Sequence, residues 1–450
     1  MSSLYQYAQQ MFQLLTDDEI GRSVPISSIG DDSIVCSTLA FASGSSQKFA
    51  QRWAWRPLSA TQPGDRVRYI ESFTSSSGTL NINSAATNYV DQTATNEVVL
   101  ITKYEPAFIC DAIQNAIKML RRMDRTEFPV VMNGSRVYLG DLDWVLDPDD
   151  VSMVKRNRSP VITRNRYLQK KNKVSTAGVQ LPDWWTVANN NDTTPFTATT
   201  YRGQKTYYSL ERSGGTDATL TQAVSALLDG VSGDAPAGET ITAVVVLLES
   251  VGGDVLLTLG DNYTSDATVN AGTDLENLVS TISLNSLASG ITVTVTSQTS
   301  NTANAVLQAY ALIGDLTDAV RRDDYPEYDI PRADRNGGYG WEWDDQAGTL
   351  AIKTDNWGRG QILVYSKRPY CGFDADRLAA GTADQDVSDA PLIPVATGAI
   401  WKLFESHGDP RAEEWRDRFE RLAVKHLNAP KPDINDRLMQ RLAPAARRFG

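Results

Sequence analysis

Cysteine and histidine are scarce in this sequence. Its 450 residues include three cysteines and two histidines. Cys36, Cys110 and Cys371 are odd in number and widely spaced, so they indicate neither a disulfide framework nor a zinc site. His407 and His426 have no second histidine or cysteine at ligand spacing, which argues against a catalytic zinc ion. We therefore expect buried free thiols, no metal and no cofactor.

Long apolar runs are also missing. The longest, residues 241–248, has the length of a buried strand and falls short of the roughly 18–20 residues that span a membrane. Residues 1–20 lack a basic stretch followed by an apolar one, so we expect no signal peptide there. The sequence predicts no membrane contact.

Basic residues are fewer than acidic ones. Lys plus Arg is 43 and Asp plus Glu is 55, which gives a formal net charge of −12. Phosphate contacts need clustered Lys and Arg, so general nucleic-acid binding is not expected. An acidic surface repels DNA, a property that suits a channel through which DNA slides. The basic run 155–173 fits contact with DNA, contact with an acidic partner protein, or a solvated loop or interface strand, and the sequence leaves these alternatives open.

Catalytic motifs are the last notable absence. No GxSxG, Walker A or GxGxxG pattern occurs in the strand–turn–helix setting that each requires. Adjacent carboxylates such as Glu413 and Glu414 point apart on a helix and do not form an acid–base pair. Pairs assembled from distant positions are left open. We expect no catalytic residues and no enzymatic activity.

Helical periodicity is present on both sides of the middle of the chain. One apolar stripe follows Pro106 and ends in a basic stretch, and further stripes lie near the C-terminus. We predict that their apolar side chains form either the cores of helices or a ring interface. These side chains are Ile113, Ile117, Leu120, Trp401, Trp415 and Phe419.

Between these helices, residues 184–314 alternate like strands. Short apolar or alternating runs are separated by Gly, Asn, Asp and Ser turns, which is typical of an antiparallel sandwich or jelly roll. The predicted fold is an α+β multidomain protein: a helical bundle with small β elements, plus an inserted antiparallel β-sandwich. The expected parts are 1–183, the sandwich 184–314, 315–427, and a C-terminal arm 428–450.

Tryptophan and tyrosine together outnumber phenylalanine, with 10 and 17 against 11. Both combine an apolar ring with a polar group, which suits sugar stacking as well as protein interfaces. Five of them surround the β-rich segment and are candidates for a glycan platform, with packing in the core as the alternative. They are Trp184, Trp185, Tyr207, Tyr208 and Tyr263.

Two resemblances follow from longer stretches. The runs "YYSLERSGGTDATLTQAV", "GETITAVVVLLES", "GITVTVTSQTS" and "AVLQAYALIG" resemble non-catalytic, carbohydrate-binding-like jelly rolls. The flanking runs "EPAFICDAIQNAIKMLRRM", "GRGQILVYSKRPY" and "LIPVATGAIWKLFESHGDPRAEEWRDRFERLAVKH" resemble a head-to-tail adaptor or connector (neck protein) of a tailed bacteriophage.

The adaptor resemblance implies a structural virion protein. Such proteins form rings, commonly twelve-fold, that bridge the portal protein and the tail or nozzle proteins and continue the DNA channel. It implies passing DNA bound without sequence specificity, a place at the head–tail junction after assembly in the host cytoplasm, and an outward-facing jelly roll. It also implies a C-terminal arm that docks on the portal or a neighbour through Arg437, Arg441, Arg447, Arg448 and Phe449.

Two alternatives remain beside the adaptor. In the first, the chain is a tail or adhesion protein whose β-sandwich binds host-surface glycans. In the second, it is a glycoside-acting enzyme with an appended binding module, which the absence of a recognisable acidic pair disfavours.

Overall fold

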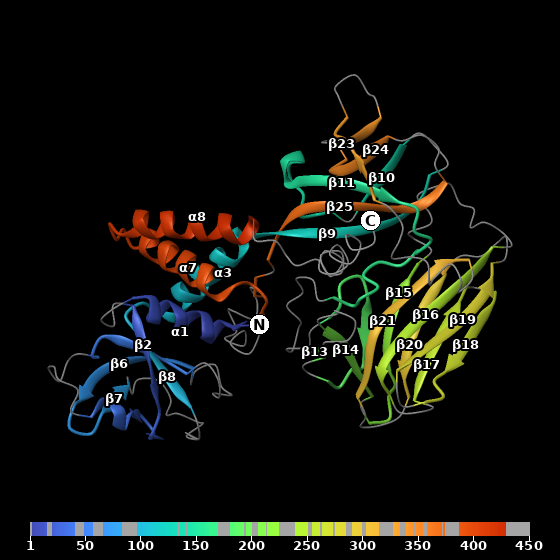
Figure 1. The fold of residues 1–450 in the computed structure, drawn as a ribbon. Helices are drawn as coiled ribbons and strands as arrows, with labels where there is room; N and C mark the ends of the chain where they lie inside the picture. The colour runs from blue at the N-terminus through green and yellow to red at the C-terminus, as the bar shows by residue number, and fades with distance from the viewer. Residues whose placement is uncertain are drawn as a thin grey trace, which may run out of the picture. The chain divides into compact units, whose positions relative to one another are not determined.

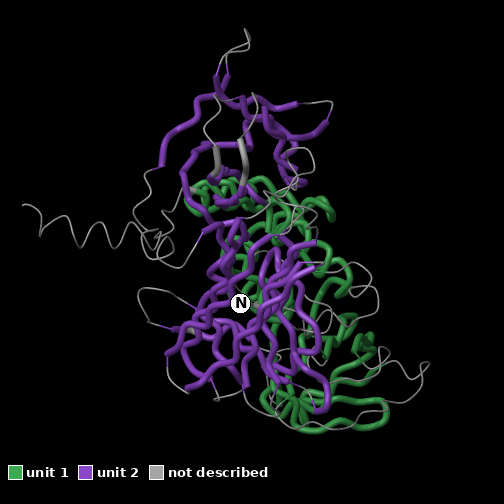
Figure 2. Tube along the Cα trace, turned by 90° about the vertical axis from the view of Figure 1, so that its right-hand side faces the viewer, with its two compact units in different colours: residues 1–122, 176–178, 369–429 green, residues 123–175, 179–368, 430–450 purple. Residues whose placement is uncertain are grey.

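The computed structural model divides the chain into two compact units (Figure 2). Unit 1 comprises residues 1–122, 176–178 and 369–429, and unit 2 comprises residues 123–175, 179–368 and 430–450. The structure describes residues 2–15, 20–40, 49–56, 66–82, 97–132, 136–140, 142–169, 181–192, 195–199, 206–212, 214–224, 239–250, 254–261, 263–272, 275–284, 290–298, 303–314, 327–333, 339–344, 347–353, 358–370, 372–373 and 387–428.

Unit 1 contains a seven-stranded antiparallel sheet in the order β2-β8-β5-β6-β7-β4-β3 (Figure 1). Alternate side chains such as Ile34, Leu80 and Ile101 form its core. The turn into β7 requires Gly78, because its φ is +70° and a Cβ there would lie 2.2 Å from the carbonyl oxygen of Cys36. The strands are β2 (Gly21–Pro25), β3 (Ser28–Ile29), β4 (Ser33–Val35), β5 (Arg52–Trp55), β6 (Val67–Thr74), β7 (Thr79–Ile82) and β8 (Val98–Thr102), and the 3-10 helix η1 is Ser37–Leu39.

The α-helices described by the structure all belong to unit 1, where α7 packs against α1, α3 and α8. Their buried apolar faces form one core that includes Ile113, Ile117 and Leu403. The helices are α1 (Leu4–Leu14), α3 (Pro106–Met119), α7 (Leu392–Ser406) and α8 (Ala412–Asn428). A short strand at the N-terminus, β1 (Ser2–Ser3), pairs with β26 (Val387–Ser388).

Local signals explain where the helices begin. Ser3 and Gln6 form a reciprocal capping box at the start of α1, and Pro106 occupies the first turn of α3.

Gly398 lets α7 pack closely on its neighbours, since a Cβ there would lie 2.7 Å from the ring of Phe419 and 3.0 Å from the Cβ of Ala116.

Two smaller sheets of unit 2 share a core that includes Val154, Ile352 and Ile362. One has the order β22-β11-β25-β9 and the other the order β10-β24-β23. Their strands are β9 (Arg121–Met132), β10 (Arg136–Leu139), β11 (Val151–Asn157), β22 (Tyr328–Ile330), β23 (Gly340–Asp344), β24 (Thr349–Lys353) and β25 (Gly358–Pro369), and the 3-10 helix η2 is Pro148–Asp150.

The rest of unit 2 is a β-sandwich of two five-stranded antiparallel sheets (Figure 1). The first sheet has the order β12-β15-β20-β17-β18: β12 (Thr186–Ala188), β15 (Ala218–Ala223), β17 (Val255–Gly260), β18 (Ser265–Val269) and β20 (Thr292–Ser297). The second has the order β13-β14-β21-β16-β19: β13 (Phe196–Ala198), β14 (Thr206–Glu211), β16 (Thr240–Glu249), β19 (Glu276–Ser283) and β21 (Ala303–Ile313).

The two sheets differ in how their faces are buried. In the first sheet, β17 buries Val255, Leu257 and Leu259 in the core between the sheets, and the residues between them face outward. In the second sheet, β16 and β21 are buried almost throughout, and Val244 and Leu312 lie in a separate small cluster with Val161. The first sheet therefore offers the accessible face of the sandwich.

The predicted β-sandwich is confirmed, but the predicted fold class is wrong. Of the described residues, 49% lie in strands and 22% in helices, and there are five antiparallel sheets of three or more strands. The helices of unit 1 pack beside a seven-stranded sheet, so they are not a bundle with small β elements. The four-part division of the chain stays a prediction.

Candidate functional site

The outer face of the first sandwich sheet is built by simple alternation. In β15, Ala218, Leu220 and Gln222 are buried, while Thr219 and Thr221 lie between them and are half-buried. The same period in the other four strands places one set of side chains in the core and the other set outside. We call the outward set the threonine face. Its members are Thr186, Ala188, Thr219, Thr221, Ala223, Leu256, Thr258, Gly260, Ser265, Ala267, Val269, Thr292, Thr294 and Thr296.

The middle of this face is a line of four threonines on four adjacent strands. Thr186 lies opposite Thr221, Thr221 opposite Thr294, and Thr294 opposite Thr258. Strand spacing makes this central threonine row about 14 Å long. Two of its hydroxyls interact directly, since Thr221 Oγ1 donates a hydrogen bond to Thr294 Oγ1 at 3.3 Å. The row therefore presents a continuous series of hydroxyl and methyl groups.

The rows on either side carry fewer hydroxyls. On one side, Thr219 and Thr296 lie opposite each other and are flanked by Ala188 and Leu256. Val269 continues this row on β18 and is 46% exposed. On this side the central row is thus bordered by two further hydroxyls and by the apolar side chains of Ala188, Leu256 and Val269.

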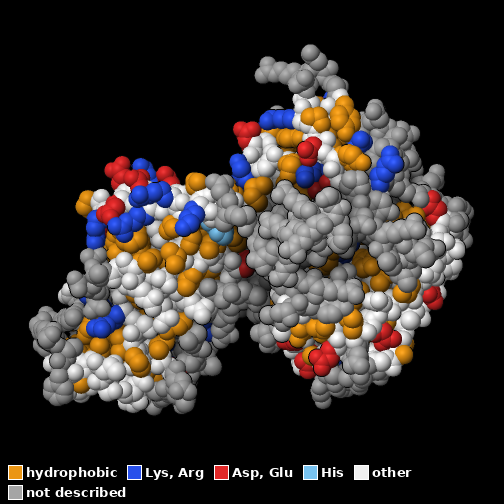
Figure 3. All heavy atoms as spheres, in the orientation of Figure 1, with side chains coloured by type: hydrophobic (Ala, Val, Ile, Leu, Met, Phe, Trp, Pro, Cys, Tyr) orange, Lys and Arg blue, Asp and Glu red, His pale blue; other side chains and the backbone are white. Residues whose placement is uncertain are grey.

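Charge is absent from the threonine face. None of the outward side chains on the described strands of this sheet is acidic or basic. Asp266 on β18 faces the other way and accepts a hydrogen bond from the backbone N–H of Thr281 on β19 at 2.8 Å. By contrast, Figure 3 shows acidic and basic side chains crowded together over α8. The described strands of this face therefore offer no side chain for an ion pair with a ligand.

The hairpin between two strands of this sheet carries an exposed aromatic residue, Tyr263. The hairpin between β17 and β18 follows Gly260, and Asp261 Oδ1 accepts hydrogen bonds from the N–H groups of Tyr263 at 2.7 Å and Thr264 at 2.6 Å. These bonds hold the tight turn. Tyr263 is 57% exposed, so its ring is available at the hairpin.

The five aromatic residues of the predicted glycan platform do not come together. Trp185 and Tyr208 belong to the core of the sandwich, where no sugar reaches them. Burial raises the pKa of Tyr208 to about 12, although its hydroxyl accepts a hydrogen bond from Asn190 Nδ2 at 3.3 Å. Trp184 stacks on the guanidinium of Arg164 at 4.3 Å, and Tyr207 is half-buried. Of the five, Tyr263 lies in the hairpin between β17 and β18, and Trp184 and Trp185 directly precede β12.

The other predicted site residues have definite places. Five of the six helix residues lie in the core of unit 1, and Trp401 packs against Phe419 with ring centres 5.6 Å apart. In the basic run 155–173, Lys155 pairs with Glu327 at 3.1 Å. Residues 170–173 of that run lie outside the described residues, and so does the arm with Arg437, Arg441, Arg447, Arg448 and Phe449.

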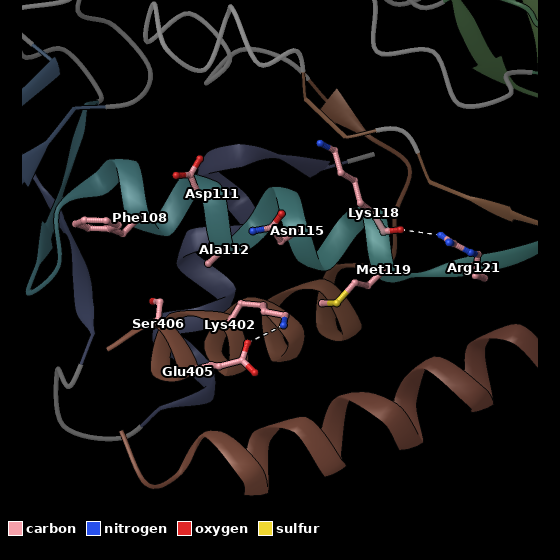
Figure 4. A pocket seen from close by; sticks show the side chains of 10 residues that line it. All are labelled: Phe108, Asp111, Ala112, Asn115, Lys118, Met119, Arg121, Lys402, Glu405 and Ser406. Atoms are coloured by element: carbon pink, nitrogen blue, oxygen red, sulfur yellow. Dashed lines mark hydrogen bonds and ion pairs between the residues drawn. The ribbon is translucent and has the colours of Figure 1, made fainter. Parts of the chain in front are cut away.

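Unit 1 carries a groove of about 630 Å³ between α3 and α7 (Figure 4). Phe108 and Met119 lie toward its two ends, and charged side chains lie between them. Lys402 pairs with Glu405 at 2.7 Å, and Arg121 donates to the carbonyl oxygen of Lys118 at 2.7 Å. Apolar, acidic and basic groups alternate along the groove, so its lining favours no single ligand chemistry.

The described residues contain neither a cluster of metal ligands nor a membrane-spanning helix. Within the described residues, no group of three or more His, Cys, Asp or Glu side chains is placed to hold a metal ion. None of the described helices combines the length and the apolar character that a membrane crossing needs. The expectations of no cofactor and no enzymatic activity stay predictions.

Comparison with known proteins gives matches among solved structures alone. No protein-family model matches the sequence, and no curated protein matches it. Among solved structures, the enzymatically active domain of bacteriophage CBA120 tailspike protein 4 is 11% identical, with a TM-score of 0.24; the match covers 32% of this chain and 21% of that one. This chain thus matches about a fifth of that structure.

Carbohydrate-binding modules are also among the matches. TmCBM61, solved in complex with β-1,4-galactotriose, is 16% identical with a TM-score of 0.23, covering 33% of this chain and 99% of that one. The CBM22-1 xylan-binding domain from Paenibacillus barcinonensis Xyn10C is 12% identical with a TM-score of 0.22, covering 32% and 97%. Similarity at this level says nothing about the ligand of this chain. The resemblance to a phage adaptor receives no support from these matches.

The threonine face can be recognised in the sequence by threonines at alternate positions, a pattern that does not involve the aromatic residues. The segments "ATLTQA" and "TVTVTS" place threonine at every second position, with apolar residues between. Such spacing puts all the hydroxyls on one face of a strand. The pairing of the strands, which aligns Thr221 with Thr294, cannot be read from either segment alone.

Proposed function

We propose that this protein binds neutral glycans through the threonine face, in the manner of a tail or adhesion protein that attaches to glycans on a host surface. The observation that carries the proposal is a five-stranded sheet face that bears rows of hydroxyls and no charge. The face is accessible on one side and is fixed from behind by the core of the sandwich.

The chemistry of the face suits a sugar. Each threonine hydroxyl donates one hydrogen bond and accepts others, which matches the donor and acceptor character of sugar hydroxyls. The threonine methyl groups, Leu256 and Val269 offer apolar contacts for the C–H groups of a sugar ring. Because no charge is desolvated on binding, a neutral ligand avoids the cost that a buried charge would bring.

A glycan-binding assay tests the proposal. We expect the full chain to bind neutral oligosaccharides on a glycan array and by calorimetry, and to bind polygalacturonate and other anionic glycans more weakly. β-1,4-Galactotriose and xylohexaose are suitable neutral probes. Affinity should change little between low and high salt, because no ion pair forms. Binding of anionic glycans alone, or of no glycan, would contradict the proposal.

The adaptor function predicted from the sequence is the competing account. Mass photometry with and without portal protein separates the two. Rings or portal-dependent complexes without glycan binding would favour the adaptor. A dimer that dissociates when Thr294 is replaced by Glu would instead identify the threonine face as a contact between two copies of the chain. The place of the protein at a head–tail junction stays a prediction.

A further inference from the structure

The central threonine row has a direction. It crosses four strands at about 4.8 Å per step, whereas successive outward residues on one strand lie roughly 6.6–6.8 Å apart. Thr221 and Thr294, neighbours across strands, are joined by a hydrogen bond of 3.3 Å. The closest series of hydroxyls therefore runs perpendicular to the strands.

The central threonine row has two defined ends. It begins at Thr186 on β12 and ends at Thr258 on β17, since the next position, on β18, is Ala267. Beside Thr258, β17 continues to Gly260, which has no side chain and is followed by the hairpin that carries Tyr263. The row is therefore four threonines long on the described strands, with Ala267 beyond Thr258 on β18.

We infer that the ligand is an unbranched, neutral glycan that lies across the strands along Thr186, Thr221, Thr294 and Thr258. This inference rests on the proposed function and adds the orientation and the class of the ligand. A chain across the strands meets one threonine for about every 4.8 Å of its length. A chain along β20 meets Thr292, Thr294 and Thr296 instead, at wider intervals.

A matched pair of substitutions on β15 tests the orientation. Thr219 and Thr221 are both half-buried on the same strand and the same face, but only Thr221 lies in the central row. Valine keeps the shape and the strand preference of threonine and removes the hydroxyl. We expect Thr221→Val to weaken binding of a neutral oligosaccharide by about fivefold, the value of one hydrogen bond. Thr219→Val removes a hydroxyl from the neighbouring row of the same face and should weaken binding less, by at most about twofold.

A second pair on β20 completes the test. Thr294→Val should weaken binding as Thr221→Val does, and Thr296→Val, in the neighbouring row, should weaken it less. Equal losses for Thr294→Val and Thr296→Val, with none for Thr221→Val, would overturn the orientation and leave glycan binding in place. Failure of the unchanged protein to bind any neutral glycan would overturn the proposed function itself. Circular dichroism and the melting temperature confirm that each variant is folded.

Discussion

At the scale of single residues, the phase of each strand decides which side chains are available for binding. Tyr207 and Tyr208 are neighbours on β14 and point to opposite faces, so only one of them can enter the core. Tyr208 is the buried one, and Trp185 is buried as well. The sequence indicates strands here but does not decide which alternate side chains face the core. Apolar and aromatic residues occur at both odd and even positions of these strands. The sequence alone therefore does not show which of the five aromatic rings are exposed to a ligand.

Cys36 gives a prediction about pH at this scale. Burial raises the pKa of its thiol from 9.0 to about 12. The folded protein thus favours the protonated thiol, and above pH 9 only the unfolded chain loses the proton. The free energy of unfolding is therefore unaffected by this thiol below pH 9. Between pH 9 and about 12 it falls by about 1.4 kcal/mol per pH unit. Only the thiolate reacts with alkylating reagents.

We accordingly expect iodoacetamide to modify Cys36 slowly in the native protein at pH 9 and rapidly in urea at the same pH. Peptide mass spectrometry at pH 7, 8 and 9 measures the rate for this residue. Equal rates in native and unfolded protein would show that the thiol is neither buried nor raised in pKa.

At the scale of secondary-structure elements, helices were easier to predict than sheets. The stripe of Ile113, Ile117 and Leu120 and the position of Pro106 are local signals, and α3 begins at that proline. The sheet of unit 1 depends on distant pairing, such as β2 with β8, whose residues Gly21 and Thr102 lie opposite each other. Local patterns indicate separate strands but not a seven-stranded sheet. The sequence alone therefore predicts less β-structure than the protein has.

Gly398 provides a test of helix packing. A methyl group at this position would press on the ring of Phe419 and on Ala116, so Gly398→Ala should destabilise unit 1 by about 1–3 kcal/mol despite the better helix propensity of alanine. Chemical denaturation followed by circular dichroism measures the change. Gly140→Ala is the control, because nothing lies within 4 Å of a Cβ there. A Gly398→Ala variant as stable as the control would contradict the close packing of α3, α7 and α8.

At the scale of the whole molecule, charge is unevenly distributed. The net charge is −12, and α8 carries several acidic and basic side chains in exposed pairs, including Arg418 with Glu414. The threonine face carries none. Composition alone predicts a poor nucleic-acid binder but does not locate an uncharged face, since that requires the register of five strands. The β-sandwich could be predicted from turn spacing, whereas its binding face could not.

The central claim is that neutral glycans bind on the threonine face. Photo-crosslinking tests it most directly, with a photoactivatable derivative of the bound oligosaccharide, the full chain and peptide mass spectrometry. The account predicts labelled residues in β12, β15, β17 and β20 and competition by the unmodified sugar. Labelling confined to unit 1, or to β16, β19 and β21, would contradict it.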